Sequence, residues 1–167
     1  MREATLIATG AKPVIRFERF LPRPLEDVWR AVTDPEELRA WFPTRIEIER
    51  WETGADLLHH VDGRSLPPVP GTVVECSAPH RLVFTWGEDT IGFELSETEG
   101  GTVFVLTEEL GPSVAARNAA GWEVCLERLV DGMHGADSED WRPRFERYTA
   151  SFAPLLGAQD GPPGEHA

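Results

Sequence analysis

Cysteine, tyrosine and long apolar runs are scarce in this sequence of 167 residues. The two cysteines, Cys76 and Cys125, are too few for a disulfide framework and do not have the spacing of a zinc site. We therefore expect both to be free thiols that pack like small hydrophobic side chains. No apolar run approaches the roughly 18 residues that a membrane-spanning helix needs, so no such span is predicted.

Basic residues are also scarce, because 16 Lys and Arg stand against 29 Asp and Glu and give a net charge of −13. A surface this acidic repels the phosphates of nucleic acids and of anionic membranes, so neither is an expected partner. The first ten residues lack the basic start and apolar stretch of a signal peptide. These features together predict a cytoplasmic protein.

Large apolar rings, by contrast, are abundant: the chain has six Trp and eight Phe, and 41% of its residues are hydrophobic. A chain of this length typically forms one domain around one core. We expect a flexible arm at residues 1–12, a single domain at residues 13–156 and a disordered tail, rich in Gly and Pro, at residues 157–167.

The first third of the chain predicts one strand and two short helices. Residues 14–20 alternate apolar and charged side chains, which is the period of a half-buried strand. An apolar stripe at helical spacing follows in residues 25–32. Asp34 and Pro35 predict the start of a second helix, and Glu37 is placed to complete a capping box with Asp34.

The remainder predicts a run of strands and then helices. Strands with turns between them are expected at residues 45–51, 55–61, 72–77, 81–86, 90–96 and 102–108, with a loop at 63–71. A long helix is expected from Pro112 to Met133, with an acidic loop at 137–140 and a final helix after Pro143. One face of the strands is apolar and must be covered, so we predict an α+β fold in which the long helix packs against an antiparallel sheet.

Several short segments, in this order and spacing, resemble one known superfamily. They are Phe-Glu-Arg at 17–19, Asp-Pro-Glu-Glu-Leu at 34–38, Trp-Phe at 41–42, Gly-Thr-Val-Val-Glu at 71–75, Pro-His-Arg-Leu-Val-Phe-Thr-Trp at 79–86, Phe-Glu-Leu at 93–95 and Gly-Trp at 121–122. Over about residues 14–133 the chain resembles the SRPBCC superfamily, and within it the branch similar to Aha-type activators of the heat-shock chaperone ATPase. The resemblance implies the helix-grip fold of START domains and birch-pollen-allergen-like proteins, in which a curved sheet wraps a long C-terminal helix and leaves a cavity between them.

The superfamily has no shared catalytic residues to carry over, so the predicted site is a set of cavity-lining side chains. These are Trp41, Phe42, Leu57, His59, Leu82, Phe84, Trp86, Phe93, Phe104, Leu106, Glu108, Trp122, Leu126 and Leu129. No metal site, cofactor motif or catalytic triad is recognised in the sequence.

Two groups in this set could carry proton chemistry. His59 and His60 are adjacent on a strand and therefore point to opposite faces, so they cannot chelate one metal together. Glu108 shares the parity of Phe104 and Leu106 and should point inward or lie at the rim. Beside apolar rings its pKa would be raised and it could act as a general acid or base. The alternative is a rim carboxylate in water or paired with Arg81 or Arg45.

Three functions follow as hypotheses. The first is the binding of a hydrophobic or aromatic small molecule in the cavity, without catalysis. The second is an enzyme similar to polyketide cyclases and aromatases, with Glu108 and His59 or His60 moving protons. The third is a co-chaperone-like protein-interaction domain. The protein is expected to be a monomer, or a homodimer that uses the final helix.

Overall fold

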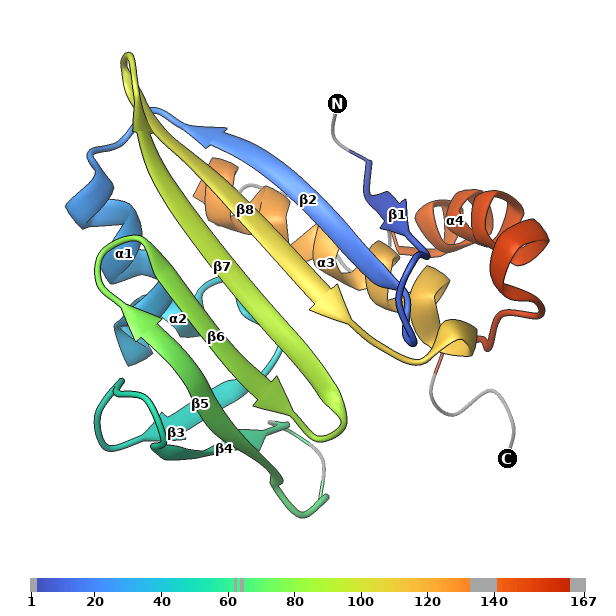
Figure 1. Cartoon of the computed structure of the whole chain (residues 1–167), viewed down its shortest axis with the longest axis horizontal. Helices are drawn as coiled ribbons and strands as arrows, with labels where there is room; N and C mark the ends of the chain where they lie inside the picture. The colour runs from blue at the N-terminus through green and yellow to red at the C-terminus, as the bar shows by residue number, and fades with distance from the viewer. Residues whose placement is uncertain (1–2, 62, 64, 133–140, 163–167) are drawn as a thin grey trace.

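The strands form one antiparallel sheet that curves around the long helix (Figure 1). The computed structural model describes all residues except 1–2, 62, 64, 133–140 and 163–167. The strands are β1 (Thr5–Ile7), β2 (Val14–Leu21), β3 (Arg45–Ile48), β4 (Asp56–His60), β5 (Val69–Ser77), β6 (Arg81–Trp86), β7 (Asp89–Thr98) and β8 (Gly101–Glu109). Their order across the sheet is β1-β2-β8-β7-β6-β5-β4-β3. The predicted α+β class is therefore confirmed.

The helices lie on the concave side and at the two ends of the sheet (Figure 1). They are α1 (Leu25–Thr33), α2 (Pro35–Arg39), α3 (Ala115–Asp131), preceded by a 3-10 turn at Pro112–Val114, and α4 (Trp141–Leu156). The long helix α3 runs across the sheet behind β2 and β8, whereas α4 packs against α3 beside β1. None of the described helices is long and apolar enough to cross a membrane.

The pairing of β2 with β8 brings the first predicted strand beside the last predicted strand. Ile15 lies opposite Glu108 in this ladder, and Phe17 lies opposite Leu106. On the other side of β8, Ile91 of β7 also lies opposite Glu108. Since alternate residues of a strand face the same side, this register turns the apolar side chains and Glu108 toward α3.

The start of α2 follows the predicted chemistry only in part. The Asp34 carboxylate accepts hydrogen bonds from the backbone N–H groups of Glu36 and Glu37, as expected for an N-cap. The backbone N–H of Asp34, however, is donated to the carbonyl of Arg30 at 2.8 Å. This N–H is therefore not available to the Glu37 side chain, and the predicted capping box does not form.

Described residues near both chain ends make contacts with the rest of the domain. Within residues 1–12, Thr5–Ile7 pair with β2 as an edge strand, and the backbone N–H of Ala4 is donated to the Tyr148 hydroxyl at 2.9 Å. Within residues 157–167, the Gln159 side chain accepts a hydrogen bond from the backbone N–H of Ala116. Backbone groups at a helix start need such partners, which explains why this segment is held there.

Other boundaries of the helices and strands differ from the predicted ones by a few residues. The predicted loop at 63–71 ends earlier, because β5 begins at Val69. The last helix begins at Trp141, with Pro143 in its first turn, where a missing backbone N–H breaks no helical hydrogen bond. Met133 and the predicted acidic loop at 137–140 lie outside the described residues.

Candidate binding site at Glu108

Glu108 is a buried carboxyl group between the sheet and α3. It is the second-last residue of β8 and only 1% exposed. One of its oxygens, Oε1, accepts a hydrogen bond from the indole N–H of Trp122 at 3.0 Å and from the Asn118 side-chain amide at 3.1 Å. Trp122 and Asn118 are four residues apart on α3, so both side chains project from the same helix face. The predicted inward direction of Glu108 is confirmed.

The alternative of a solvated or Arg-paired rim carboxylate is wrong. Arg81, one of the expected partners, forms ion pairs with Glu75 and Glu94 on the exposed face instead. The acidic neighbour of Glu108 is Asp89 at the start of β7, whose carboxyl group hydrogen-bonds to it. Two carboxyl groups can share a hydrogen bond only if one of them carries a proton.

Burial raises the pKa of Glu108 from its ordinary value of 4.5 to about 8. The nearby Asp89 charge contributes to this rise, whereas the hydrogen bonds from Trp122 and Asn118 oppose it. Burial also raises the pKa of Asp89, and the hydrogen bond to Glu108 opposes that rise. At neutral pH Glu108 is therefore mainly the protonated partner and donates to the Asp89 carboxylate.

A pocket of about 160 Å³ adjoins this carboxyl group. Its lining residues are Pro43, Trp86, Glu108, Arg117, Asn118, Gly121, Trp122 and Cys125. Pro43 is exposed and Arg117 is partly exposed, so the pocket communicates with solvent on that side. Three of the fourteen predicted site residues, Trp86, Glu108 and Trp122, thus lie together in one pocket.

Most of the other predicted residues fill the interior. Phe42 sits at the centre, with its ring centroid 5.4 Å from Trp122, 6.1 Å from Phe84 and 6.4 Å from Phe93. Trp41 joins this cluster, with its ring centroid 5.6 Å from Phe42 and 6.1 Å from Phe104. The predicted members that are buried in this core are Trp41, Phe42, Leu57, Leu82, Phe84, Phe93, Phe104, Leu106, Leu126 and Leu129. The segment after α2 therefore occupies much of the space between sheet and helix, and the pocket at Glu108 lies beside it.

His59 is buried but has no ring nitrogen available for a ligand. Its Nε2 lies 3.1 Å from the Thr85 carbonyl oxygen, and its Nδ1 lies 3.1 Å from the Thr44 hydroxyl. A carbonyl only accepts, so Nε2 carries the proton and Nδ1 accepts from Thr44. Burial lowers the pKa of His59 from 6.5 to about 4. The neutral ring stacks on Trp86 at 5.0 Å and supports that wall of the pocket.

His60 points to the other face of the sheet, as predicted for adjacent strand residues. Its Nε2 lies 2.7 Å from a Glu47 carboxylate oxygen. No group of three or more His, Cys, Asp or Glu side chains within the described part of the chain is arranged to hold a metal ion. Cys76 and Cys125 are both free, as expected.

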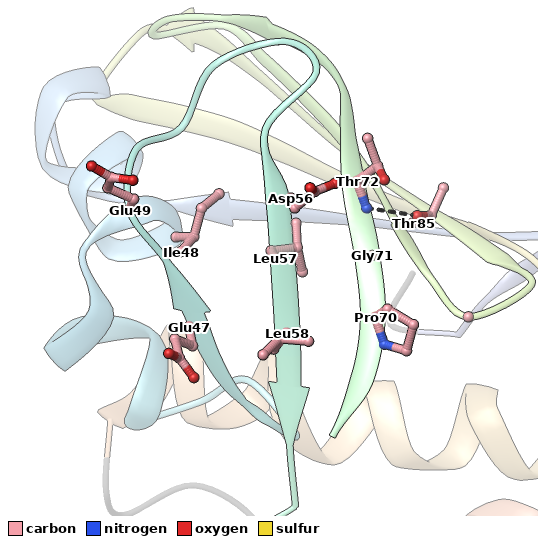
Figure 2. A pocket seen from close by; sticks show the side chains of 11 residues that line it. Glu47, Ile48, Glu49, Asp56, Leu57, Leu58, Pro70, Gly71, Thr72 and Thr85 are labelled. Atoms are coloured by element: carbon pink, nitrogen blue, oxygen red, sulfur yellow. Dashed lines mark hydrogen bonds between the residues drawn. The ribbon is translucent and has the colours of Figure 1, made fainter. Parts of the chain in front are cut away.

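A broader hollow lies on the outside of the sheet over β3, β4 and β5 (Figure 2). It measures about 750 Å³ and carries the carboxylates of Glu47, Glu49 and Asp56 beside apolar side chains such as Leu58. Leu57, one of the predicted cavity residues, also borders it. The three carboxylates are exposed to solvent. This surface buries a small molecule less completely than the pocket at Glu108, which is the better candidate site.

Asp89 and Asn118 were missed by the sequence interpretation, although each carried a signal. Asp89 has the same strand parity as Ile91 and Phe93, but it lies one residue before the strand expected at residues 90–96. Asn118 precedes Trp122 by one helical turn and therefore shares its face.

An antiparallel sheet curved around a long C-terminal helix, with short helices after the second strand, defines the helix-grip class of fold. The chain belongs to the family described as Activator of Hsp90 ATPase homolog 1-like protein, whose sequence model matches residues 22–133. The resemblance to the Aha-type branch of the SRPBCC superfamily is thereby confirmed.

Solved structures share this fold over nearly the whole chain. CalU16 from Micromonospora echinospora has a TM-score of 0.70 at 22% identity, with 93% of this chain and 96% of that chain covered. EF2215 from Enterococcus faecalis, described as a conserved protein of unknown function, has a TM-score of 0.76 at 21% identity, with 91% of each chain covered. The BPP1335 protein from Bordetella parapertussis has a TM-score of 0.65 at 26% identity, with 85% and 87% covered. Among curated proteins, none matches the chain.

Proposed function

We propose that this protein binds a small apolar or aromatic molecule in the pocket beside Glu108. The observation that carries the proposal is a hollow of about 160 Å³ with a buried carboxyl group at its wall. Sites for small molecules are typically apolar concavities with a few well-placed polar groups. Trp86, Trp122 and Cys125 supply the apolar surface, and Glu108 with Asn118 supplies the polar groups.

The size of the pocket limits its occupant. An apolar cavity of about 150 Å³ is large enough for benzene in other proteins. We therefore expect a single ring, or the ring-bearing end of a longer molecule that extends past Pro43 into solvent. A ligand of seven or eight non-hydrogen atoms is expected to bind with a dissociation constant on the order of 0.1–1 mM, since small ligands gain limited free energy per atom.

The proposal is tested by filling the pocket with a side chain. Cys125→Leu adds volume inside the pocket, and Cys76→Leu is the matched control because Cys76 lies outside it. Calorimetric titration with toluene, phenol and indole should show binding to the wild type and to Cys76→Leu, and none to Cys125→Leu. Equal binding to all three proteins, or binding to none, would overturn the proposal.

Proton transfer by Glu108 is a second candidate, because its pKa of about 8 keeps a proton on this buried group at neutral pH. His59 does not support such chemistry, since both of its ring nitrogens are already hydrogen-bonded. The candidate predicts that any compound chemically converted by the wild type is left unchanged by Glu108→Gln. Mass spectrometry of the products measures the rate of conversion. An equal rate for the wild type and the variant would reject this second candidate.

A further inference from the structure

Arg117 lies on the solvent side of the pocket, next to its buried interior. The lining side chains of Glu108, Trp122 and Cys125 are buried, whereas Arg117 is partly exposed. The lining thus changes from an apolar interior with one buried carboxyl group to a guanidinium at the opening. A ligand whose ring enters the hollow would therefore place its outer substituent beside Arg117.

The guanidinium of Arg117 keeps donors available for such a substituent. Its Nη1 donates to the Gly161 backbone carbonyl at 3.3 Å, which is long for a hydrogen bond. In the described part of the chain this is its only hydrogen bond, and it forms no ion pair there. Arg144 and Arg147 on α4, by contrast, are both paired with Glu123. Since a carboxylate matches the planar fork of a guanidinium and accepts more strongly than a carbonyl, a ligand carboxylate can replace the Gly161 contact.

A second donor borders the same edge of the pocket. Gly121 lines the hollow one helical turn after Arg117 on α3, so the two residues share a helix face. A Cβ at Gly121 would lie 4.0 Å from the indole Nε1 of Trp141. Among the residues that the structure describes, none accepts a hydrogen bond from this indole N–H. Both polar groups at this edge are donors, and they complement a substituent that carries acceptor oxygens.

We propose that the ligand of this pocket is a small aromatic carboxylate, with its ring against Trp86 and Trp122 and its carboxylate paired with Arg117 at the opening. This inference rests on the proposed function and specifies its ligand class. Asp89 does not compete for the guanidinium, because its carboxyl group is hydrogen-bonded to Glu108 instead. Solvent screens a pair at this partly exposed position, so the charge should add about fivefold in affinity.

The inference is tested with three ligands of one planar shape. Benzoate is an anion at pH 7, benzamide is neutral and benzamidine is a cation. Calorimetric titration should show that benzoate binds about fivefold more tightly than benzamide, and that benzamidine binds more weakly than both. Because salt screens exposed charges, the preference for benzoate over benzamide should shrink when NaCl is raised to about 0.5 M.

Two variants separate the role of Arg117 from a general effect of net charge. Arg117→Gln should abolish the preference for benzoate over benzamide. Arg50→Gln removes the same charge from an exposed position outside the pocket and should retain the preference.

The outcomes distinguish this inference from the proposed function. If the neutral compounds bind and benzoate binds no better than benzamide, the carboxylate inference is overturned and the proposed function stands. If the preference for benzoate survives in Arg117→Gln, or is lost equally in Arg50→Gln, the inference is likewise overturned. If no compound binds at millimolar concentration, both fail.

Discussion

Replacing Glu108 by Gln should stabilise the protein at neutral pH, although it alters a fully buried polar group. Gln has the shape of a protonated Glu, so its oxygen can accept from Trp122 and Asn118 while its amide donates to Asp89. The substitution therefore keeps the hydrogen bonds and removes the titration. The expected gain can be worked from the pKa of Glu108.

In the unfolded chain this carboxyl ionises near 4.5, whereas the native protein holds its proton up to about pH 8. Folding thus takes up a proton between these values, and the Glu108 contribution to the free energy of unfolding falls as the pH rises, by up to about 1.4 kcal/mol per pH unit. At pH 7, about 2.5 pH units above the ordinary pKa, the loss amounts to ~3 kcal/mol. Glu108→Gln should not show this loss of unfolding free energy, because the Gln side chain does not ionise.

The assay is urea unfolding of the wild type and Glu108→Gln, monitored by tryptophan fluorescence. It is repeated at intervals from pH 4 to pH 8. The quantity of interest is the difference between the two proteins, because titration of His59 affects both equally. This difference should grow by about 3 kcal/mol from pH 4 to pH 7. Glu109→Gln is the control and should follow the wild type. Parallel curves for wild type and Glu108→Gln over this range would refute a buried, protonated Glu108.

Three further predictions concern groups around the site. The His59 ring should stay neutral, with its proton on Nε2, until the pH falls to about 4. The contribution of the neutral ring to stability is therefore lost as the pH falls from 6.5 toward 4. An NMR titration of the native protein with a midpoint near 6.5 would contradict this. Gly121→Ala should raise the free energy of unfolding by about 0.5–1 kcal/mol, because it lies inside α3 and a Cβ there would have 4.0 Å to the nearest atom outside its own helix backbone. Gly132→Ala, at a φ of 73°, should destabilise instead, and chemical denaturation of both variants checks the pair. The Cys125 thiol, with its pKa raised by burial to about 12, should resist iodoacetamide in the native protein while the partly exposed Cys76 reacts first; mass spectrometry showing equal labelling would refute its burial.

The strand periods and the helical stripe were enough to predict the layers of this fold. Alternation along β6, β7 and β8 correctly turned Phe84, Phe93 and Glu108 inward, since side-chain direction in a strand depends only on parity. The same rule separated His59 from His60. Strand parity, however, does not predict which residues a side chain contacts across the interior. The hydrogen-bond partners of Glu108 are therefore known only from the structure.

The extent of the pocket could not be predicted for a related reason. Trp41 and Phe42 were expected to border a cavity, but how far their rings reach depends on the turn that joins α2 to β3. The structure places Phe42 against Trp122 and Phe84, where it fills space that the sequence pattern left undetermined. The edge strand Thr5–Ile7 was equally hidden, because three residues are too few to show a period.

The most direct test of the account is an NMR titration that follows the indole N–H signals of the tryptophans while toluene is added. Trp122 donates its indole N–H to Glu108 at the pocket wall, whereas Trp41 and Trp51 donate theirs to the carbonyls of Ala31 and Thr33. A pocket that binds small apolar molecules predicts a large, saturable shift of the Trp122 signal and little change at Trp41 and Trp51. An unchanged Trp122 signal at saturating toluene would contradict the account.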